Sequence, residues 1–561
     1  MLAGLERLEY RGYDSAGICT SDNNSLFVHK KKGRVEILKS ASLPGSTGIG
    51  HSRWSTHGQP SDRNAHPFLD RSNRFSVVHN GIIENYLELK EELRREGVEF
   101  ASDTDSEVLV HLIARYYQEN SDFKEAVLKT IERLQGAYAF CVIKNDSPEI
   151  IGGRNGSPLI VGIGNNENFL ASDVSAVIEH TRTVMYLNDF QIASITPEKV
   201  EIFDFQGQPH RIETKEVNWN LEQAQKQGYK HFMLKEIFEQ PEVFEDCCRI
   251  EVQIAKPTPI IIVACGTANY AGWIGKYVIE KIAKIPVTVE IASEFRYKEP
   301  LFSPDSLVIV ISQSGETADT LAAVRLAKQQ GAKTLGIINV QDSTIARETD
   351  AVIYTRAGPE IGVASTKAFI AQLVVLYKLA FHLAGKGWSG AEMVPLLEEA
   401  LKLNESARIL AQKYFQYQNF LYIGRNRNYP LALEGALKLK EISYIHAEAY
   451  PAGELKHGPI SLVSEEVPTL AICPQDSVYE KTLSNIQEIK ARNGKVIAIA
   501  TEGDEKISKI ADEVIYVPPV EEIFYPFLIA IPLQLFAYHV ADRRECDIDQ
   551  PRNLAKSVTV E

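Results

Sequence analysis

The chain has 561 residues, with 60 Lys or Arg against 74 Asp or Glu, which gives a formal net charge of −14 at pH 7. This length allows about 3–4 domains of ordinary size. The acidic balance argues against a nucleic-acid-binding protein, which needs a basic surface. The seven cysteines are scattered and include no CxxC pair, as is typical of a reduced chain without a disulfide framework. We therefore expect a cytoplasmic protein with no nucleic-acid partner.

One stretch is apolar enough to raise the question of a membrane. Residues 523–541 read IFYPFLIAIPLQLFAYHVA, which is long enough to cross a bilayer. Pro526, Pro532, Gln534 and His539 interrupt it, so a buried core helix is the better interpretation. The first ten residues already contain charged side chains and are not a signal peptide. We expect no membrane association.

The N-terminal third is rich in short β-like runs, with helical patterns between them over residues 83–96 and 106–118. The runs cover residues 25–38, 74–83, 137–145, 157–164 and 200–205. Clustered strands with a few helices predict a layered α/β/β/α domain. Residues 206–245 then turn polar and end in a helical pattern near HFMLKEIFEQPEVF, which predicts a linker.

From residue 250 onward, apolar β-runs alternate with long helical patterns, as in a doubly wound parallel sheet. Residues 333–338 resemble residues 495–500, and residues 349–354 resemble residues 511–516 at the same offset. Upstream, IIIVACG is mirrored by FLYIGRN. We therefore expect two copies of one α/β sandwich, at about residues 250–390 and 410–550.

The segment SQSGET, residues 312–317, follows a predicted strand and opens a predicted helix. Three hydroxyls and a glycine at a helix N-terminus suit a phosphate, because backbone N–H groups and the helix dipole favour an anion there. A simple serine cap is the alternative. The segment lacks a P-loop lysine, which argues against a nucleotide triphosphate. Thr267, after the neighbouring strand, should face the same crevice.

Residues 434–458 combine a carboxylate, an amine and an imidazole. Read as a helix, Glu434, Lys438 and Glu441 fall on one face, and Pro451 then breaks the helix before His457. Such groups suit sugar ring opening and proton shuttling. The alternative is a salt-bridged surface helix followed by a turn, because charge pairs at this spacing are common.

Together with ACGT, EIGVASTKAF and the tail DQPRNLAKSVTVE, these motifs resemble the glutamine–fructose-6-phosphate aminotransferase (isomerizing) family, the glucosamine-6-phosphate synthases. The N-terminal third resembles a class II glutamine amidotransferase domain of the N-terminal-nucleophile type, and the two copies resemble sugar isomerase (SIS) domains. The resemblance implies an α/β protein with an αββα amidotransferase domain, incomplete at its N-terminus, over residues 1–205. A linker (206–249), two SIS domains (250–390 and 410–550) and an active-site tail (551–561) follow.

The resemblance also implies roles at a sugar site. Glu441 matches the base that moves a proton between C1 and C2, with Lys438 and Glu434 as supporting charges. His457 matches a ring-opening histidine that reaches the site from the partner subunit of a homodimer. Lys556 matches the lysine that engages the open-chain ketose. Residues matching sugar-phosphate contacts are Thr267, Ser312, Gln313, Ser314, Thr317, Val363 and Ser365.

One position departs from the pattern: the family often has Ser where this chain has Ala268, so one hydroxyl contact to the phosphate is expected to be absent. A second set of residues matches the family's glutamine site: Arg53, Trp54, Thr56, His57, Asn80, Gly81 and Asp105. Within it, Asn80-Gly81 matches an oxyanion-hole loop, whereas the dipeptide alone favours a hairpin turn.

The family reaction converts D-fructose 6-phosphate and L-glutamine to D-glucosamine 6-phosphate and L-glutamate, the first step of the hexosamine pathway. No cofactor and no metal is implied, because no His/Cys cluster has zinc spacing and no GxGxxG follows a strand. Four alternatives stay open: an ammonia-dependent synthase, a sugar-phosphate isomerase without glutaminase activity, a non-catalytic SIS-type sensor, and a deglycase acting on fructosamine phosphates, against which the tail DQPRNLAKSVTVE argues. Glu441, His457 and Lys556 together argue against the sensor.

The family's glutaminase begins at a cysteine whose thiol attacks the amide and whose own α-amine acts as the base. Residues 1–10, MLAGLERLEY, resemble the family's first helix, and the preceding strand with that cysteine is not in the sequence. Cys19 lies within the chain and has no free α-amine, so we reject it as the nucleophile. We expect a start codon placed too late, since loss of a core strand would leave a sheet edge bare. The alternative is a chain that cannot use glutamine.

Overall fold

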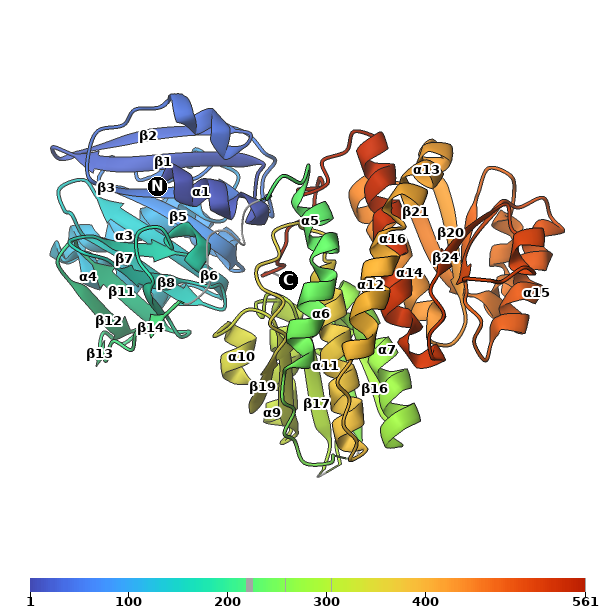
Figure 1. The fold of residues 1–561 in the computed structure, drawn as a ribbon. Coiled ribbons are helices and arrows are strands. Elements are labelled where there is room, and N and C mark those ends of the chain that lie inside the picture. Colours follow the sequence, from blue (N-terminus) through green and yellow to red (C-terminus); the bar gives the residue numbers. More distant parts are fainter. Residues whose placement is uncertain (218–225, 258, 304, 560–561) are drawn as a thin grey trace. The chain divides into compact units, whose positions relative to one another are not determined.

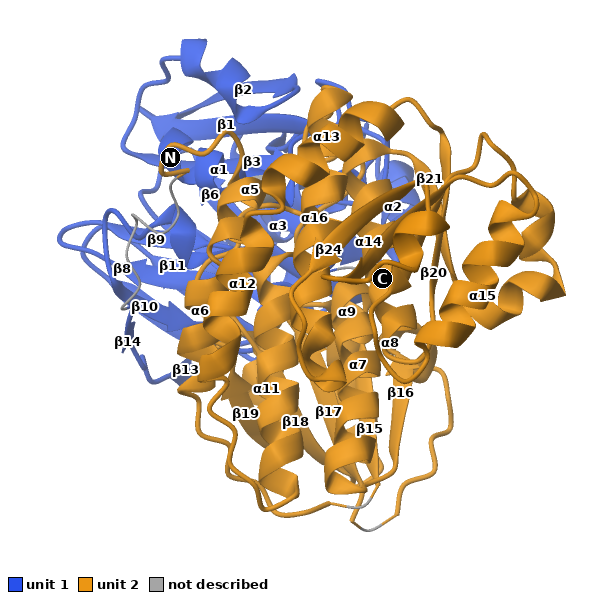
Figure 2. Ribbon diagram, turned by 45° about the vertical axis from the view of Figure 1, so that its right-hand side comes forward, with its two compact units in different colours: residues 1–221, 557–561 blue, residues 222–556 orange. Residues whose placement is uncertain are grey.

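The computed structural model describes residues 1–217, 226–257, 259–303 and 305–559. The chain forms two compact units (Figures 1 and 2). Unit 1 comprises residues 1–221 and 557–561, and unit 2 comprises residues 222–556. Each unit has its own buried apolar clusters, and we describe each by itself.

Unit 1 is built on a seven-stranded antiparallel sheet. Three helices, α2 (Tyr86–Arg95), α3 (Glu107–Asn120) and α4 (Phe123–Ile131), pack their apolar faces with this sheet in one buried cluster. The strand order is β13 (Pro209–His210), β12 (Val200–Asp204), β11 (Gln191–Ile195), β7 (Ile150–Asn155), β6 (Gly136–Lys144), β5 (Phe75–Ile83), β4 (Phe68–Leu69).

Two smaller sheets complete unit 1. One has the order β2 (Ser25–Lys32), β1 (Ser15–Asp22), β3 (Thr47–Arg53). The other has the order β14 (Lys215–Glu216), β10 (Thr183–Tyr186), β8 (Ile160–Ile163), β9 (Asn168–Ala171). Strands β3 and β9 are therefore edge strands of their sheets. The expected β-run over residues 25–38 is only partly correct, because Gly33 with φ 121° ends β2 and residues Val35–Ser40 form a 3-10 helix.

Unit 2 contains two five-stranded parallel sheets with the same strand order, which confirms the repeat. The first is β16 (Val287–Ile291), β15 (Ile260–Ala264), β17 (Leu307–Ser312), β18 (Lys333–Ile338), β19 (Ala351–Tyr354). The second is β21 (His446–Pro451), β20 (Asn419–Gly424), β22 (Thr469–Cys473), β23 (Val496–Thr501), β24 (Glu513–Val517).

Helices pack on these sheets at equivalent places in the two copies. Helices α7 (Gly266–Ala283), α9 (Ala318–Gln329) and α11 (Lys367–Leu383) belong to the first copy. Helices α14 (Asn428–Ser443), α15 (Tyr479–Lys490) and α16 (Tyr525–Arg543) belong to the second. Helix α7 contacts α14, so the two copies share one large apolar cluster.

The apolar stretch at residues 523–541 forms most of α16. In the described part of the chain, residues Glu522–Arg543 are the one helical segment long and apolar enough to cross a membrane, and that apolar window is entirely buried inside the protein. Its side chains join the shared cluster of unit 2. The expectation of a buried core helix is confirmed.

The helix over residue 434 ends earlier than the sequence suggests. Helix α14 stops at Ser443, and Tyr444 takes a left-handed conformation with φ 61°. Strand β21 follows and includes Pro451, which therefore ends a strand and not the helix. The surface-helix alternative is also wrong, because Glu434 and Lys438 are 0% and 1% exposed.

The helical pattern near residue 231 forms two short helices, α5 (Phe232–Phe238) and α6 (Gln240–Cys248). Pro241 near the start of α6 marks the junction between them, where its missing N–H costs nothing. Met233, Ile237 and Phe244 join the apolar cluster of unit 2. These two helices therefore belong to the core of unit 2 and are more than a connecting segment.

Candidate active sites

The first site lies at the carboxyl ends of two neighbouring parallel strands of unit 2. Strands β15 and β17 pair directly, and the segments that follow them begin α7 and lead to α9. This edge of an open parallel sheet is where ligands usually bind. A cavity of about 120 Å³ lies here. Its lining residues are Cys265, Thr267, Ala268, Ile311, Ser312, Gln313, Ser314, Thr317, Thr320, Ser365, Gln372 and Lys556.

The SQSGET loop is held open by its own hydroxyls. Ser312 Oγ accepts the N–H of Gly315 at 3.0 Å and lies 3.1 Å from Thr317 Oγ1. Gly315 has φ 66°, and an added Cβ would lie 1.8 Å from Ser343 Oγ, so only glycine fits. Thr317 stands at the N-cap of α9, so the segment opens a helix as expected, and the cap residue is not a serine. The loop therefore directs hydroxyls and a helix N-terminus at the cavity.

A buried charge cluster on α14 adjoins this cavity. Lys438 Nζ donates to Thr267 Oγ1 at 3.1 Å, and Thr267 lines the cavity. The same ammonium lies 2.6 Å from Glu441 Oε2 and 3.6 Å from Glu434 Oε1. The expected face of α14 is therefore formed, and Thr267 links it to the cavity.

The electrostatics of this cluster differ between its two carboxyls. Burial raises the pKa of Glu434 to about 7, while Lys438 opposes that shift. Burial also disfavours the charge on Lys438, but Glu434 and Glu441 outweigh it and raise the pKa of the lysine. Lys438 is therefore an ammonium at neutral pH. The half-buried Glu441 side chain is 20% exposed, so it is the carboxyl that solvent and a ligand can reach.

The tail lysine enters the same cavity and is held by a buried glutamate. Lys556 Nζ lies 2.5 Å from Glu360 Oε2 and donates to the carbonyl of Gly362 at 2.8 Å. Ser365 Oγ also donates to Glu360 Oε2, at 3.0 Å. Val363 is 8% exposed but is not among the cavity-lining residues, and its N–H donates to the carbonyl of Asp549.

His457, like Val363, is an expected sugar-site residue that does not line the cavity of its own chain. It ends the short helix η6 (Ala452–His457), is exposed, and is not among the cavity-lining residues. Three groups that the sequence reasoning missed do lie here: Glu360, Gln372 and Thr320. Glu360 stands at the start of the quoted EIGVASTKAF motif, which could have suggested it. Gln372 and Thr320 carry no local signal.

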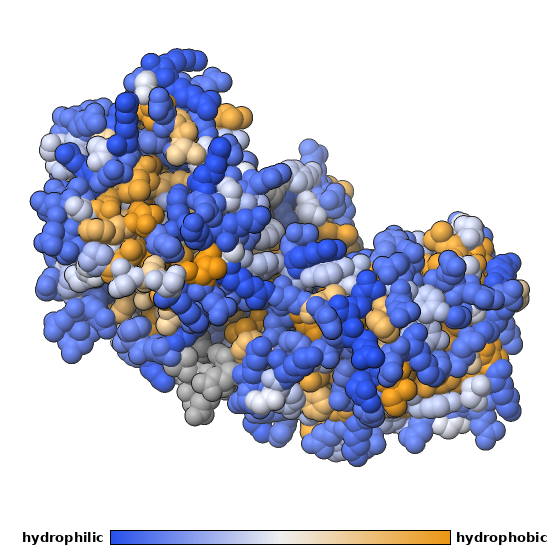
Figure 3. Space-filling view, turned by 90° about the horizontal axis from the view of Figure 1, so that it is seen from above, coloured by the Kyte–Doolittle hydropathy of each residue, from blue (hydrophilic) through white to orange (hydrophobic). Residues whose placement is uncertain are grey.

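The second site lies in unit 1. A cavity of about 600 Å³ is lined by residues of both edge strands, β3 and β9, and by residues of β5 and β6. Figure 3 shows apolar side chains on the face of unit 1 turned toward the viewer. Six of the seven expected glutamine-site residues line the cavity: Arg53, Trp54, Thr56, Asn80, Gly81 and Asp105. His57 is half-buried and is not among them.

Opposite charges are fixed in this cavity. Arg53 Nη2 donates to the carbonyl of His57 and, at 3.1 Å, to that of Gly58. The Asp105 carboxylate accepts the N–H of Ile83 at 2.9 Å. Both side chains are buried, and Asp105 favours the charged form of Arg53 against the burial that lowers its pKa. A cation and an anion lining one cavity suit an α-amino acid.

Asn80 and Gly81 lie inside strand β5 and do not form a hairpin turn. Gly81 has φ 116°, and an added Cβ would lie 2.0 Å from the carbonyl oxygen of Ala137, so glycine is required. Asn80 Oδ1 lies 2.7 Å from His51 Nε2. The turn alternative is therefore wrong, and the strained position is typical of a functional site.

Burial favours the neutral form of two histidines that line this cavity, His51 and His79. Burial lowers the pKa of His51 to about 4, against the hydrogen bond to Asn80 Oδ1, and burial also lowers the pKa of His79. Cys19 is fully buried in β1, and burial raises its pKa to about 11, which agrees with rejecting it as a nucleophile. Among the described residues, no group of His, Cys, Asp or Glu could hold a metal ion.

Comparisons with known protein families agree with this architecture. Residues 253–382 and 413–541 each match the SIS domain, and residues 51–179 match a glutamine amidotransferase domain. The two SIS matches coincide with the two five-stranded sheets, and the amidotransferase match lies in unit 1.

Curated relatives match over the whole chain. A glutamine–fructose-6-phosphate aminotransferase (isomerizing) of Aquifex aeolicus is 51% identical over 100% of this chain and 97% of its own length. Proteins of the same name from Chlorobaculum tepidum and Thermus thermophilus are each 49% identical with the same coverage.

Solved structures match unit 2. The C-terminal domain of a glucosamine-fructose-6-phosphate aminotransferase from Francisella tularensis is 43% identical, covers 58% of this chain and 100% of its own, and has a TM-score of 0.55. A glucosamine-6-phosphate deaminase from Thermotoga maritima shares the fold at 24% identity, with a TM-score of 0.51 over 59% of this chain and 100% of its own.

Proposed function

The chain belongs to the glutamine–fructose-6-phosphate aminotransferase (isomerizing) family, and on that premise we propose that it converts D-fructose 6-phosphate and L-glutamine to D-glucosamine 6-phosphate and L-glutamate. The sugar reaction belongs to unit 2 and glutamine binding to unit 1. The observation that carries the proposal is the Lys438–Thr267 hydrogen bond, because it joins an acid–base cluster to a phosphate-sized cavity.

The phosphate of the sugar binds at the SQSGET loop. Ser312, Ser314 and Thr317 offer hydroxyl donors, and the N-terminus of α9 offers backbone N–H groups. Gln313 and Thr267 also line the cavity, and Ala268 leaves an apolar spot where a hydroxyl would add one contact. Lys556 supplies the positive charge that the loop itself lacks.

Lys556 is held by an ion pair with the buried Glu360. Burial works against ionisation of Glu360, but Lys556 outweighs it and the pKa of this carboxyl is lowered. The ion pair with Glu360 Oε2 at 2.5 Å holds Lys556 Nζ in place as a hydrogen-bond donor. Lys556 therefore donates hydrogen bonds to the open-chain ketose, together with Ser365, and does not attack its carbonyl. Val363 contributes through its backbone, because its N–H donates to the carbonyl of Asp549 and so holds the loop that carries Ser365.

The chemical steps use groups on α14 and a partner subunit. His457 of a second copy opens the furanose ring, which exposes the C2 carbonyl. Ammonia adds there and water leaves, giving an imine. Glu441 removes a proton from C1 and returns it to C2, and the proton of the C1 hydroxyl moves to the imine nitrogen, so that C1 becomes the aldehyde and C2 carries the amine. Lys438 orients Glu441 through the ion pair at 2.6 Å, while the buried Glu434 balances Lys438.

Glutamine binds in the cavity of unit 1. Arg53 faces its α-carboxylate and Asp105 its α-amine, since these are the cation and the anion that line the cavity. Asn80 and Gly81 stabilise the oxyanion that forms when the amide is attacked. Trp54, Thr56 and His57 close over the bound amino acid. The protein acts in the cytoplasm. Its active form is a homodimer, because His457 lies away from the sugar cavity of its own chain.

The test supplies fructose 6-phosphate with glutamine labelled with ¹⁵N at the side-chain amide, and in a second arm with ¹⁵N-ammonium chloride. Mass spectrometry should detect ¹⁵N-glucosamine 6-phosphate, and Glu441→Gln should abolish it in both arms. If only the ammonium arm gives product, the proposed sugar reaction is supported and the proposed use of glutamine is not. Absence of the amino sugar from both arms contradicts the proposal.

A further inference from the structure

Helix α5 presses a buried glutamate against the loop that carries the sugar contacts. Glu236 is 2% exposed. Its Oε1 accepts the N–H of Ile361 at 2.5 Å and that of Gly362 at 3.2 Å. These residues lie in the loop that links β19 to α11 and that bears Val363 and Ser365. One side chain from α5 therefore fixes two consecutive peptide units next to the sugar cavity.

The approach of α5 to this loop is close. An added Cβ on Gly362 would lie 2.9 Å from Glu236 Oε2 and 3.5 Å from the Cα of Met233. Glu236 Oε2 is buried and has no hydrogen-bond partner among the described residues. Burying a carboxyl oxygen without a hydrogen-bond partner costs free energy. Apolar packing alone therefore does not explain why a glutamate stands at this position.

Gly362 is held from both sides. Its N–H donates to Glu236, and its carbonyl accepts from Lys556 Nζ at 2.8 Å. Lys556 in turn pairs with Glu360, whose other oxygen accepts the N–H groups of Thr366 and Ala368. The position of Lys556 thus depends on where Glu236 holds Gly362.

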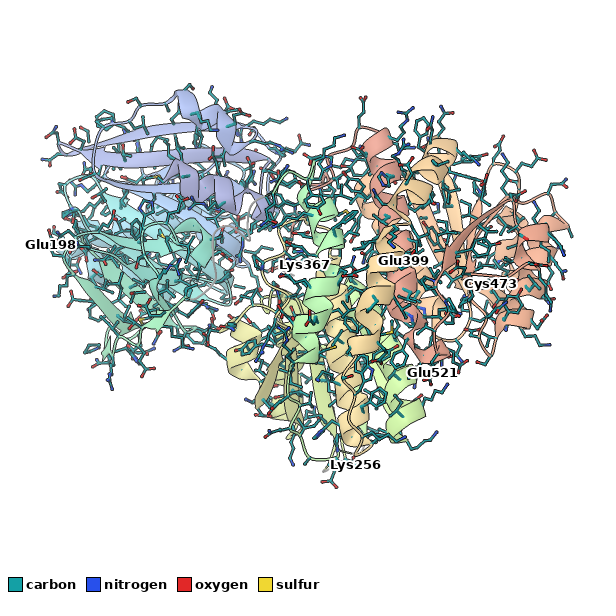
Figure 4. The ribbon with its side chains drawn as sticks, in the orientation of Figure 1. Glu198, Lys256, Lys367, Glu399, Cys473 and Glu521 are labelled. Carbon is teal, nitrogen blue, oxygen red and sulfur yellow. The ribbon has the colours of Figure 1, made fainter. Side chains whose placement is uncertain are left out.

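The start of α5 also holds the segment that leads to the tail. Asp549 accepts the N–H groups of Phe232 and Met233, each at 3.0 Å, and its carbonyl accepts the N–H of Val363. Lys367 at the start of α11, labelled in Figure 4, lies 2.7 Å from Glu239 just after α5. The loop between β19 and α11, the segment that leads to the tail, and α11 are therefore all hydrogen-bonded to residues in α5 or just after it.

We propose that Glu236 is a positioning residue of the sugar site: from α5 it fixes Gly362, and through Gly362 it places Lys556 and Ser365 for the sugar phosphate. This inference rests on the proposed sugar reaction. Glu236 does not line the cavity and does not touch the substrate. It sets affinity for fructose 6-phosphate by holding the groups that do.

The charges around Glu236 make this positioning sensitive to pH. Burial and the neighbouring Glu360 raise the pKa of Glu236 to about 7, while Lys556 and Lys367 oppose the shift. These three groups are the charges that face it, from the loop, the tail and α11. Below pH 7 the carboxyl is neutral. As the pH rises through about 7, the added negative charge competes with the sugar phosphate for Lys556, so we expect the KM for fructose 6-phosphate to rise.

The experiment compares Glu236→Ala and Glu236→Gln with the matched control Glu242→Gln, an exposed glutamate on α6. Steady-state kinetics give KM and kcat for fructose 6-phosphate, and calorimetric titration gives its Kd without relying on turnover. Glu236→Ala leaves two buried N–H groups unpaired and should raise KM and Kd by about tenfold or more, with a smaller change in kcat. The control should match the wild type.

Glu236→Gln keeps an acceptor for the two N–H groups and cannot ionise. Its KM should stay near the low-pH wild-type value and should not change between pH 6 and 8. An unchanged Kd in a folded Glu236→Ala protein overturns the proposal. If that variant does not fold, a pH profile of Glu236→Gln identical to the wild type overturns it. An inactive wild type that still binds fructose 6-phosphate would contradict the proposed reaction and leave the Kd comparison valid.

Discussion

The ammonium of Lys438 lies 2.6 Å from the carboxylate of Glu441, one turn further along α14, and also donates to Thr267 at the wall of the sugar cavity. Lys438 thus orients Glu441, the proposed base, and hydrogen-bonds to Thr267, which lines the cavity together with the SQSGET loop. Because Glu434 on the preceding turn is fully buried, Glu441 is the carboxyl of this cluster that a substrate can reach.

Glu441→Gln should remove the base while preserving shape and the contact with Lys438. A general base contributes about 10²–10⁴-fold, so exchange of the C1 proton of fructose 6-phosphate with deuterated solvent should slow on that scale. NMR measures the exchange directly. Glu434→Gln on the same helix tests the next candidate, and an unchanged exchange rate in Glu441→Gln would move the base to another group.

Lys438→Met should destabilise the protein, because it leaves carboxyls buried without their cation. Removing one partner of a buried pair typically costs about 3–5 kcal/mol. The double variant Lys438→Met with Glu434→Gln removes the buried charge as well and should regain part of that loss. Denaturant midpoints of the full chain measure both effects. Additive losses in the double variant would show that the two residues do not interact.

The raised pKa of Glu434 predicts a pH-dependent stability. In the unfolded chain the carboxyl ionises near pH 4.5, but in the folded protein it does so at about 7. Its contribution to stability is therefore fully present below pH 4.5 and is lost as the pH rises through about 7. The Tm difference between Glu434→Gln and the wild type should shift in favour of the variant over this range. A constant difference between pH 5 and 8 would contradict the assignment.

Thr317→Ala and Ser314→Ala should raise the KM for fructose 6-phosphate more than they lower kcat. The phosphate is remote from C1 and C2, so it is bound similarly in the ground state and the transition state. Steady-state kinetics over a range of sugar concentrations separate the two parameters. Thr344→Ala, a buried threonine near the loop that does not line the cavity, serves as the control. If kcat alone fell, the SQSGET loop would take part in the chemical step and not only in phosphate binding.

Local patterns predicted much of this protein. The repeat followed from apolar runs, and the shared face of Glu434, Lys438 and Glu441 followed from helical spacing. The end of α14 did not, because Tyr444 adopts a left-handed conformation that its residue type does not announce. Glu236 escaped prediction because its partners lie more than a hundred residues away, with a separation of 125 for Ile361. Only the folded chain brings them together.

The position of His457 predicts a shared site. It is exposed on η6 and away from the cavity of its own chain, whereas Glu441 adjoins that cavity through Lys438. A symmetric dimer would let each copy complete the other's site. Mixing His457→Ala with Glu441→Gln should restore activity, because a mixed dimer contains one site with both residues intact.

The mixture must exchange subunits, which differently tagged copies recovered together can demonstrate. At equal concentrations, mixed dimers should form about half of the population, and each should have one competent site of two, so about a quarter of the wild-type activity is expected. Each variant alone serves as the control. If subunits exchange and the mixture stays inactive, His457 and Glu441 act on the same sugar within one chain.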